Sequence, residues 1–225
     1  MQIILASASP RREALLAQVG LPFRVEPSGV DEDKPRRTGD PASFVEQAAL
    51  AKAEEVAARI RNGLVLGADT VVVIGRRVLG KPASAAQARR MLERLSGATH
   101  QVYTGLALVR VKGGKVTRRR TAHEVTAVTM CHLTPEDVAA YVATGEPLDK
   151  AGAYGIQGRG AVLIERIEGC YYNVVGLPLA RLARMLEELG VSAWRGNAPS
   201  PHLSLEGRGV RSGRCGHSLD AEAGR

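Results

Sequence analysis

The sequence predicts an α/β fold with a mixed β-sheet, and two observations support this prediction. Apolar runs of strand length alternate with helical patterns along most of the chain, which is typical of a sheet with helices packed against it. Two longer segments, 100–111 and 116–130, meet at Gly113-Gly114, which indicates an antiparallel hairpin inserted into that sheet.

The helices are predicted mainly from the residues that precede them. Ser9-Pro10 and Asp40-Pro41 each place a capping side chain before a proline at the first helical position, and Thr134-Pro135 repeats the pattern. Ser84 with Gln87 forms a capping-box pair. These signals predict helices over residues 10–19, 41–61, 84–95, 135–145 and 178–189.

The remaining strands are predicted from short apolar runs bounded by turn residues. Residues 24–40 are polar and irregular, and residues 146–160 are expected to form a loop because Gly and Pro recur there. Outside the hairpin, strands are expected at 3–6, 64–74, 161–167 and 171–175.

The C-terminal part of the chain differs in composition from the rest. After Gly190 the sequence is rich in Gly, Ser, Arg and Pro and shows no periodicity. We therefore expect one domain over residues 1–190 and a disordered tail over 191–225 that has no catalytic role.

Composition favours a cytoplasmic protein with an aliphatic core. The 225 residues are 44% hydrophobic but only 4% aromatic, and the net charge of +8 favours an anionic partner. No apolar run approaches the roughly 20 residues that span a bilayer, and the N-terminus is too short and uncharged for a signal peptide. The scattered cysteines Cys131, Cys170 and Cys215 argue against structural zinc.

Arginines occupy the first turn of the first predicted helix, where acids are usually preferred. The helix dipole places partial positive charge there, so Arg11 and Arg12 each cost about 0.3–1 kcal/mol unless an anion binds. A phosphate at this end would face backbone N–H groups, guanidinium groups and the hydroxyls of Ser7 and Ser9. A capped helix with solvated arginines is the alternative.

A single carboxylate, Asp69, lies inside the apolar run 64–74. A carboxylate in a buried strand must be paired or bound to a cation, so we favour a functional Asp69 over a purely structural one. Thr70 follows it and would point to the opposite face of an ideal strand, unless a twist or bulge turns it.

Two lysines also occupy unusual places. Lys52 borders the apolar stripe of its predicted helix, where it either reaches a site or extends its amine to solvent. Lys81 lies in the Gly80-Lys81-Pro82 turn just after the Asp69 strand, where it could act as a fixed charge for phosphate.

The segment 149–158 gathers an acid, a base, an amide and glycines in one loop. Its glycines permit close approach of the backbone to a ligand, and Gln157 can read a base edge because its amide both donates and accepts. Neither a G-x-G-x-x-G nor a G-x-x-x-x-G-K-[ST] pattern is present, which disfavours a dinucleotide site and a Walker-type ATPase.

Together these segments resemble the Maf family of nucleotide pyrophosphatases over about residues 2–190. The matching text is Leu-Ala-Ser-Ala-Ser-Pro-Arg-Arg at 5–12, Gly-Ala-Asp-Thr at 67–70, Gly-Lys-Pro at 80–82, Ser96-Gly97, Val-Tyr-Thr-Gly at 102–105, Leu-Asp-Lys-Ala-Gly-Ala-Tyr-Gly-Ile-Gln-Gly at 148–158 and Gly-Leu-Pro at 176–178.

The resemblance implies an elongated mixed sheet with flanking helices and a cleft between two lobes. It implies hydrolysis of a nucleoside triphosphate between the α and β phosphates, with a divalent cation such as Mg²⁺ or Mn²⁺. At the specificity positions Arg12, Thr70 and Gln157 the chain is similar to the branch that prefers dTTP and UTP. A homodimer and a role in cell-division arrest are weaker implications.

Under this resemblance, roles can be assigned to the candidate residues. Asp69 would accept a proton and, with Glu32, hold the cation, while Lys52 and Lys81 would offset charge on the leaving pyrophosphate. Asp149 would support the cation or order Lys150. The triphosphate would be held by Ser7, Ser9, Arg11 and Arg12.

Two other functions are compatible with parts of the sequence. One is a triphosphatase for other non-standard or modified nucleotides, which could use the same phosphate apparatus. The other is a nucleic-acid-binding or division-regulating module without catalysis. With two Phe and one Trp in the chain, the aromatic stacking surfaces of such a module are not evident.

Overall fold

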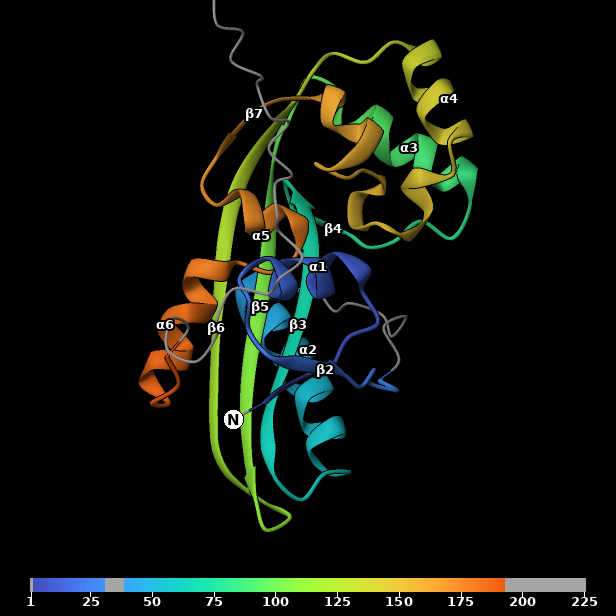
Figure 1. Ribbon diagram of the computed structural model, residues 1–225. Helices are drawn as coiled ribbons and strands as arrows, with labels where there is room; N and C mark the ends of the chain where they lie inside the picture. Colours follow the sequence, from blue (N-terminus) through green and yellow to red (C-terminus); the bar gives the residue numbers. More distant parts are fainter. Residues whose placement is uncertain (1, 31–38, 193–225) are drawn as a thin grey trace, which may run out of the picture.

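The computed structural model describes residues 2–30 and 39–192 and shows an elongated molecule built on one seven-stranded sheet (Figure 1). The strand order is β2-β1-β3-β5-β6-β7, and β4 pairs separately with β3. β1 is parallel to β2 and β3, and the other pairings are antiparallel. The strands are Phe23–Val25 (β2), Ile3–Leu5 (β1), Gly63–Ile74 (β3), Arg77–Leu79 (β4), Thr99–Lys112 (β5), Lys115–Met130 (β6) and Ile164–Glu168 (β7).

The helices divide the molecule into two lobes along the long strands β3, β5 and β6. α3 (Ala85–Leu95) and α4 (Pro135–Ala143) gather at one end of these strands, at the top of Figure 1. α1 (Pro10–Gln18), α2 (Pro41–Ala57) and α6 (Leu179–Glu188) lie further down. The expected fold class, a mixed α/β sheet with flanking helices, is confirmed.

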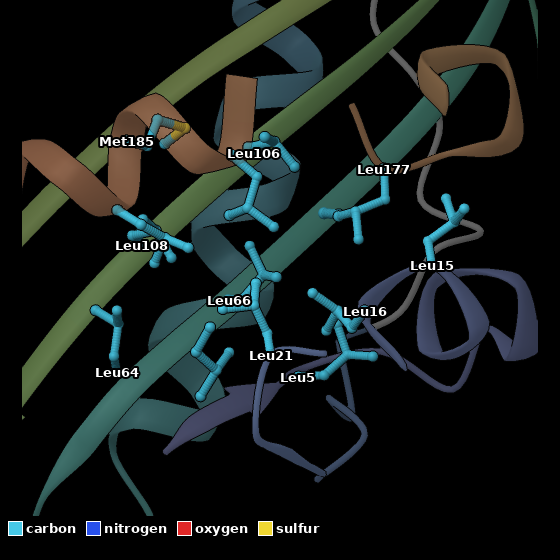
Figure 2. Packing of buried hydrophobic residues seen from close by; sticks show 14 of the residues in the cluster. Leu5, Leu15, Leu16, Leu21, Leu64, Leu66, Leu106, Leu108, Leu177 and Met185 are labelled. Atoms are coloured by element: carbon cyan, nitrogen blue, oxygen red, sulfur yellow. The ribbon is translucent and has the colours of Figure 1, made fainter. Parts of the chain in front are cut away.

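Alternate residues of the long strands supply the cores on the two sheet faces. On one face, Leu66, Leu106 and Leu108 pack against α1 and α6, as Figure 2 shows with Leu16 and Met185. On the other face, Val65, Ala107 and Val109 pack against α2. This separation follows from the two-residue period of a strand.

Two glycines allow α2 to lie unusually close to the sheet. A Cβ atom at Gly67 of β3 would collide with the carbonyl oxygen of Ala49, and one at Gly105 of β5 would collide with that of Val45. The backbone of α2 therefore rests directly on the strands at both points. This close contact positions the side chains that α2 directs toward β3.

The segment 171–175 was expected to be a strand, and this prediction is wrong. Residues Tyr171–Val175 form the short helix α5, which ends at Gly176 with φ 116°. The aromatic and β-branched residues favour a strand locally, but strand propensity yields easily to tertiary packing. Here the fully buried Asn173 donates from Nδ2 to the Val102 carbonyl and to Thr126 Oγ1, which ties the segment to the sheet as a helix.

Other boundaries also differ from the expectation. β2 lies at the start of the segment expected to be irregular, β4 was not predicted, and the 146–160 loop contains short 3₁₀ turns at Glu146–Asp149 (η1) and Ala151–Ala153 (η2). A third turn, Gly158–Leu163 (η3), replaces the start of the strand expected at 161–167. The 41–61 helix ends at Ala57.

The predicted caps are largely present. Asp40 accepts hydrogen bonds from Ala42 N and Ser43 N, and Thr134 and Asp137 form a reciprocal capping box. At α3 the Ser84 hydroxyl accepts from Gln87 N, but the Gln87 side chain accepts from Ala83 N, one residue earlier than a capping box requires.

No helix within residues 2–30 and 39–192 is long and apolar enough to cross a membrane. Of the predicted tail, residues 193–225 lie outside the described residues, as does Glu32.

Candidate active site

A cleft of about 440 Å³ opens beside an interruption in the pairing along one edge of β3. β1 pairs with β3 only as far as Leu66, and β4 pairs with it only from Val72. Between these points, in the described part of the chain, residues 67–71 have no strand partner on that side. The interruption lies at the carboxyl end of β1, the position where open α/β sheets bind ligands.

The segment that follows β1 forms one wall of this cleft. Arg12 is buried, and its guanidinium donates from Nε to the Gly176 carbonyl, from Nη1 to Ser7 Oγ and from Nη2 to Thr70 Oγ1. Ser9 occupies the N-cap position of α1 as expected, but its side chain makes no capping hydrogen bond. The segment thus presents hydroxyls, an arginine and a helix N-terminus to the cleft.

Lys52 and Asp69 form a buried ion pair at the floor of the cleft. Lys52 Nζ donates to Asp69 Oδ1 at 2.9 Å, and the two side chains are 5% and 7% exposed. The glycine-mediated contact of α2 with β3 and β5 makes this pairing possible. The sequence-based prediction that Asp69 is paired or cation-bound is therefore confirmed for one oxygen, Oδ1, which is paired with Lys52.

The second oxygen, Asp69 Oδ2, is buried and has no hydrogen-bond partner among the described residues. A carboxylate oxygen in this state fits a divalent cation, which prefers such ligands. The same residues contain no group of three or more His, Cys, Asp or Glu that could hold a metal ion without further ligands. Asp69 thus offers one ligand oxygen to such a cation, whose other ligands would be further oxygens, such as those of phosphate.

Thr70 lies on the opposite face of β3 from Asp69, as strand geometry requires, yet both residues line the cleft. They do so without a bulge in β3, because the cleft lies at the unpaired edge, which side chains from both faces can reach. Thr70 Oγ1 lies 3.0 Å from Thr104 Oγ1 on the neighbouring strand β5.

Residues from the other lobe form the opposite wall. Asp149 Oδ2 accepts from Arg11 Nη1 at 2.9 Å, and Asp149 Oδ1 accepts from Lys150 Nζ at 2.7 Å. Partial burial would raise the pKa of Asp149, but the hydrogen bonds from Lys150 and Arg11 outweigh it and lower that pKa below its ordinary value. An ion pair therefore joins the lobes at the cleft.

The remaining candidates also reach the cleft. Lys81 and Gln157 line it and are exposed, and the turn that carries Lys81 is held by a hydrogen bond from Gly152 N to the Gly80 carbonyl. The structure thus brings together all the predicted site residues that it describes, namely Ser7, Ser9, Arg11, Arg12, Lys52, Asp69, Thr70, Lys81, Asp149 and Gln157.

Several contributors were not singled out from the sequence. Thr104 and Asn173 are fully buried polar residues next to the site, and the Gly176 carbonyl binds Arg12. Tyr154 lines the cleft, and its hydroxyl lies 2.7 Å from His100 Nε2. Thr104, Tyr154 and Gly176 fall inside the sequence segments that match the Maf family, and this match was the only signal for them.

Comparisons with known proteins agree on one family. Residues 2–189 match the family described as Maf-like protein. A dTTP/UTP pyrophosphatase of Moorella thermoacetica is 58% identical over 193 residues, which are 86% of this chain and 97% of that protein. Proteins of the same name from Symbiobacterium thermophilum and Pelotomaculum thermopropionicum are 54% and 52% identical, covering 88% and 84% of this chain and 98% and 97% of their own lengths.

A more distant likeness is found among solved structures. A HAM1 protein from Coxiella burnetii has a TM-score of 0.47 and 17% identity, and the match covers 84% of this chain and 99% of that one. The family match spans most of the chain, and the curated relatives share about half of its residues over nearly their full lengths. The chain therefore belongs to the Maf family.

Proposed function

We propose that this protein hydrolyses nucleoside triphosphates, with UTP and dTTP preferred, to the nucleoside monophosphate and pyrophosphate. The observation that carries the proposal is the buried Lys52–Asp69 pair, which lines the same cleft as the Ser7–Arg12 segment. One wall binds anions, and the floor holds a carboxylate with an unpaired oxygen. The names of the relatives supply the substrates.

Each residue of the site has a separate role in phosphoanhydride cleavage. This reaction depends mainly on positioning the attacking water and on neutralising the charge of the phosphates. The N-terminus of α1, with Ser7, Ser9 and Arg11, binds phosphate oxygens. Asp69 Oδ2 accepts the proton of the attacking water, while Lys52 holds the carboxylate in place. Lys81 neutralises charge on the departing pyrophosphate.

The unpaired oxygen of Asp69 fits a divalent cation, Mg²⁺ or Mn²⁺, and Asp69 would hold it. Glu32, which lies outside the described residues, is assigned as a second ligand by the resemblance to the family alone. When bound, the cation supplies positive charge that stabilises phosphate oxygens during cleavage.

Substrate choice is assigned to Arg12, Thr70 and Gln157. Arg12 and Thr70 are hydrogen-bonded to each other, so they act as one unit. Gln157 approaches from the opposite lobe, and its exposed amide can donate to and accept from a base.

The test is a panel of nucleoside triphosphates at fixed Mg²⁺, with pyrophosphate and orthophosphate measured separately. We expect pyrophosphate release that is fastest with UTP and dTTP. Release of orthophosphate would contradict cleavage between the α and β phosphates. Faster turnover of inosine-type nucleotides would assign the chain to modified nucleotides instead.

A further inference from the structure

A chain of hydrogen bonds runs from the cleft into the core behind Thr70. Thr70 Oγ1 lies 3.0 Å from Thr104 Oγ1, and Thr104 Oγ1 lies 3.0 Å from the carbonyl oxygen of Asn173. Thr104 and Asn173 are both 0% exposed, so neither touches a ligand in the cleft. Their effect on a ligand must be transmitted through Thr70.

The direction of each bond follows from proton counting. The backbone carbonyl oxygen of Asn173 can only accept a hydrogen bond, so Thr104 must donate its single hydroxyl proton to it. Thr104 then has only lone pairs to offer Thr70. Thr70 must therefore donate its own proton to Thr104.

Arg12 completes the hydrogen bonding of Thr70. A guanidinium can only donate, so the Arg12 Nη2 bond to Thr70 Oγ1 occupies one lone pair of that oxygen. With its proton committed to Thr104, Thr70 keeps one lone pair for the cleft among the described contacts. Thr70 can thus accept a hydrogen bond from a ligand in the cleft but has no proton left to donate to one.

Asn173, the last acceptor in this series of hydrogen bonds, is itself held in place by several contacts. The Asn173 side chain is bound to the Val102 carbonyl and to Thr126 Oγ1, and Thr126 Oγ1 also binds both N and O of Cys170. The Asn173 carbonyl additionally accepts from Gly176 N. Helix α5 therefore fixes the acceptor on which the direction of the chain depends.

We propose that Thr104, oriented by the Asn173 carbonyl, is a specificity-determining positioning residue that makes Thr70 read an N–H group on the base. Uracil and thymine present the N3–H donor of an imide at this edge, whereas cytosine presents a lone pair on N3. A lone pair facing a lone pair loses a hydrogen bond and leaves both groups desolvated. The proposal rests on the proposed function and explains which pyrimidines it includes.

The experiment measures equilibrium binding of UMP and CMP by calorimetry, so that it does not depend on turnover. The full chain is compared with Thr104→Val, which keeps the side-chain shape but removes the hydroxyl. In this variant the Thr70 hydroxyl proton is no longer committed to Thr104, so Thr70 can donate it to N3 of cytosine. We expect the wild-type preference for UMP over CMP to fall by about tenfold.

Two variants separate specificity from simple loss of structure. Thr104→Ser restores the hydroxyl and should restore the preference. Thr99→Val is the matched control, because Thr99 also lies on β5 and its Oγ1 forms a similar bond of 2.9 Å, to Thr129 Oγ1 on β6, away from the cleft. It should leave the preference unchanged.

Several outcomes would overturn the proposal. One is equal binding of UMP and CMP by the wild-type chain, and another is a Thr104→Val variant that weakens both equally. If Thr104→Val does not fold, Thr104→Ala tests the same hydroxyl without the branched apolar group, and an unchanged preference there would also refute it.

Pyrophosphate release from UTP, measured on the same wild-type sample, tests the proposed function separately. A shift in UMP preference without pyrophosphate release would retain this inference and reject the activity. Pyrophosphate release together with an unchanged preference for UMP in Thr104→Val would retain the activity and reject this inference.

Discussion

Lys52 Nζ donates a hydrogen bond to Asp69 Oδ1 at 2.9 Å, and both side chains are almost fully buried. Each residue removes from its partner the cost of an isolated buried charge. The pair also fixes the direction of the carboxylate, so that Oδ2 is the oxygen left for chemistry.

Replacing Asp69 by Asn should lower the rate of pyrophosphate release by about 10³-fold, because an amide cannot accept the proton of the attacking water. The amide oxygen can still accept from Lys52, so the fold should persist. Steady-state rates with UTP measure the first effect, and circular dichroism with thermal melting measures the second. Near-wild-type rates would remove Asp69 from the mechanism.

Replacing Lys52 by Met should reduce the free energy of unfolding by about 3–5 kcal/mol, because it leaves the Asp69 carboxylate buried and uncompensated. Urea unfolding measures this change. The exposed pair of Arg119 with Glu54 is the matched control, and Arg119→Met should cost no more than about 1 kcal/mol. Equal losses of unfolding free energy in the two variants would show that the buried Lys52–Asp69 pair contributes no more to stability than an exposed pair.

His100 should make the protein sensitive to acid. Burial lowers the pKa of His100 from its ordinary 6.5 to about 4, so the unfolded chain binds a proton that the folded chain refuses between these values. Stability from this group is fully present above pH 6.5 and declines as the pH falls toward 4, by up to about 3 kcal/mol.

Urea unfolding between pH 7 and 4 tests this prediction by comparing the wild type with His100→Gln. The variant should lose the part of the acid slope that this histidine contributes. The exposed His132 offers a control, since His132→Gln should leave the slope in place. A slope unchanged in His100→Gln would contradict the assignment.

Replacing Gly67 by Ala should destabilise the fold by about 1–3 kcal/mol, because the new methyl group must push the α2 backbone off β3. The shift should also move Lys52 away from Asp69 and lower the turnover rate. Gly29→Ala is the control, since among the described residues its methyl group would meet nothing closer than Glu55 Oε1 at 4.0 Å. Thermal melting and pyrophosphate release measure both effects.

Much of the fold could be predicted because its signals are local. The hairpin at Gly113-Gly114 and the starts of α1, α2, α3 and α4 depend on residues that are neighbours in sequence. The short strands β2 and β4 carried no such signal, because each contains an arginine in place of a continuous apolar run and is defined by the partner with which it pairs.

The candidate site was predictable where a residue breaks a local rule. Asp69 in an apolar strand and arginines at a helix N-terminus are unfavourable unless something compensates them, and the structure places both at one cleft. Thr104 breaks no such rule, because a threonine in a strand is ordinary. Asn173 lies in the segment expected to be a strand, where asparagine is only mildly disfavoured and an uncharged side chain gives no strong signal.

The sequence by itself determined the fold class, most helix starts and the chemical character of the site. The tertiary structure alone decided that Tyr171–Val175 is a helix, that α2 brings Lys52 to Asp69, and that Asn173 reaches Thr70 through Thr104. The physical reason is that a cap or a turn is satisfied by adjacent residues. A buried polar group is satisfied by whichever distant partner the packed chain delivers.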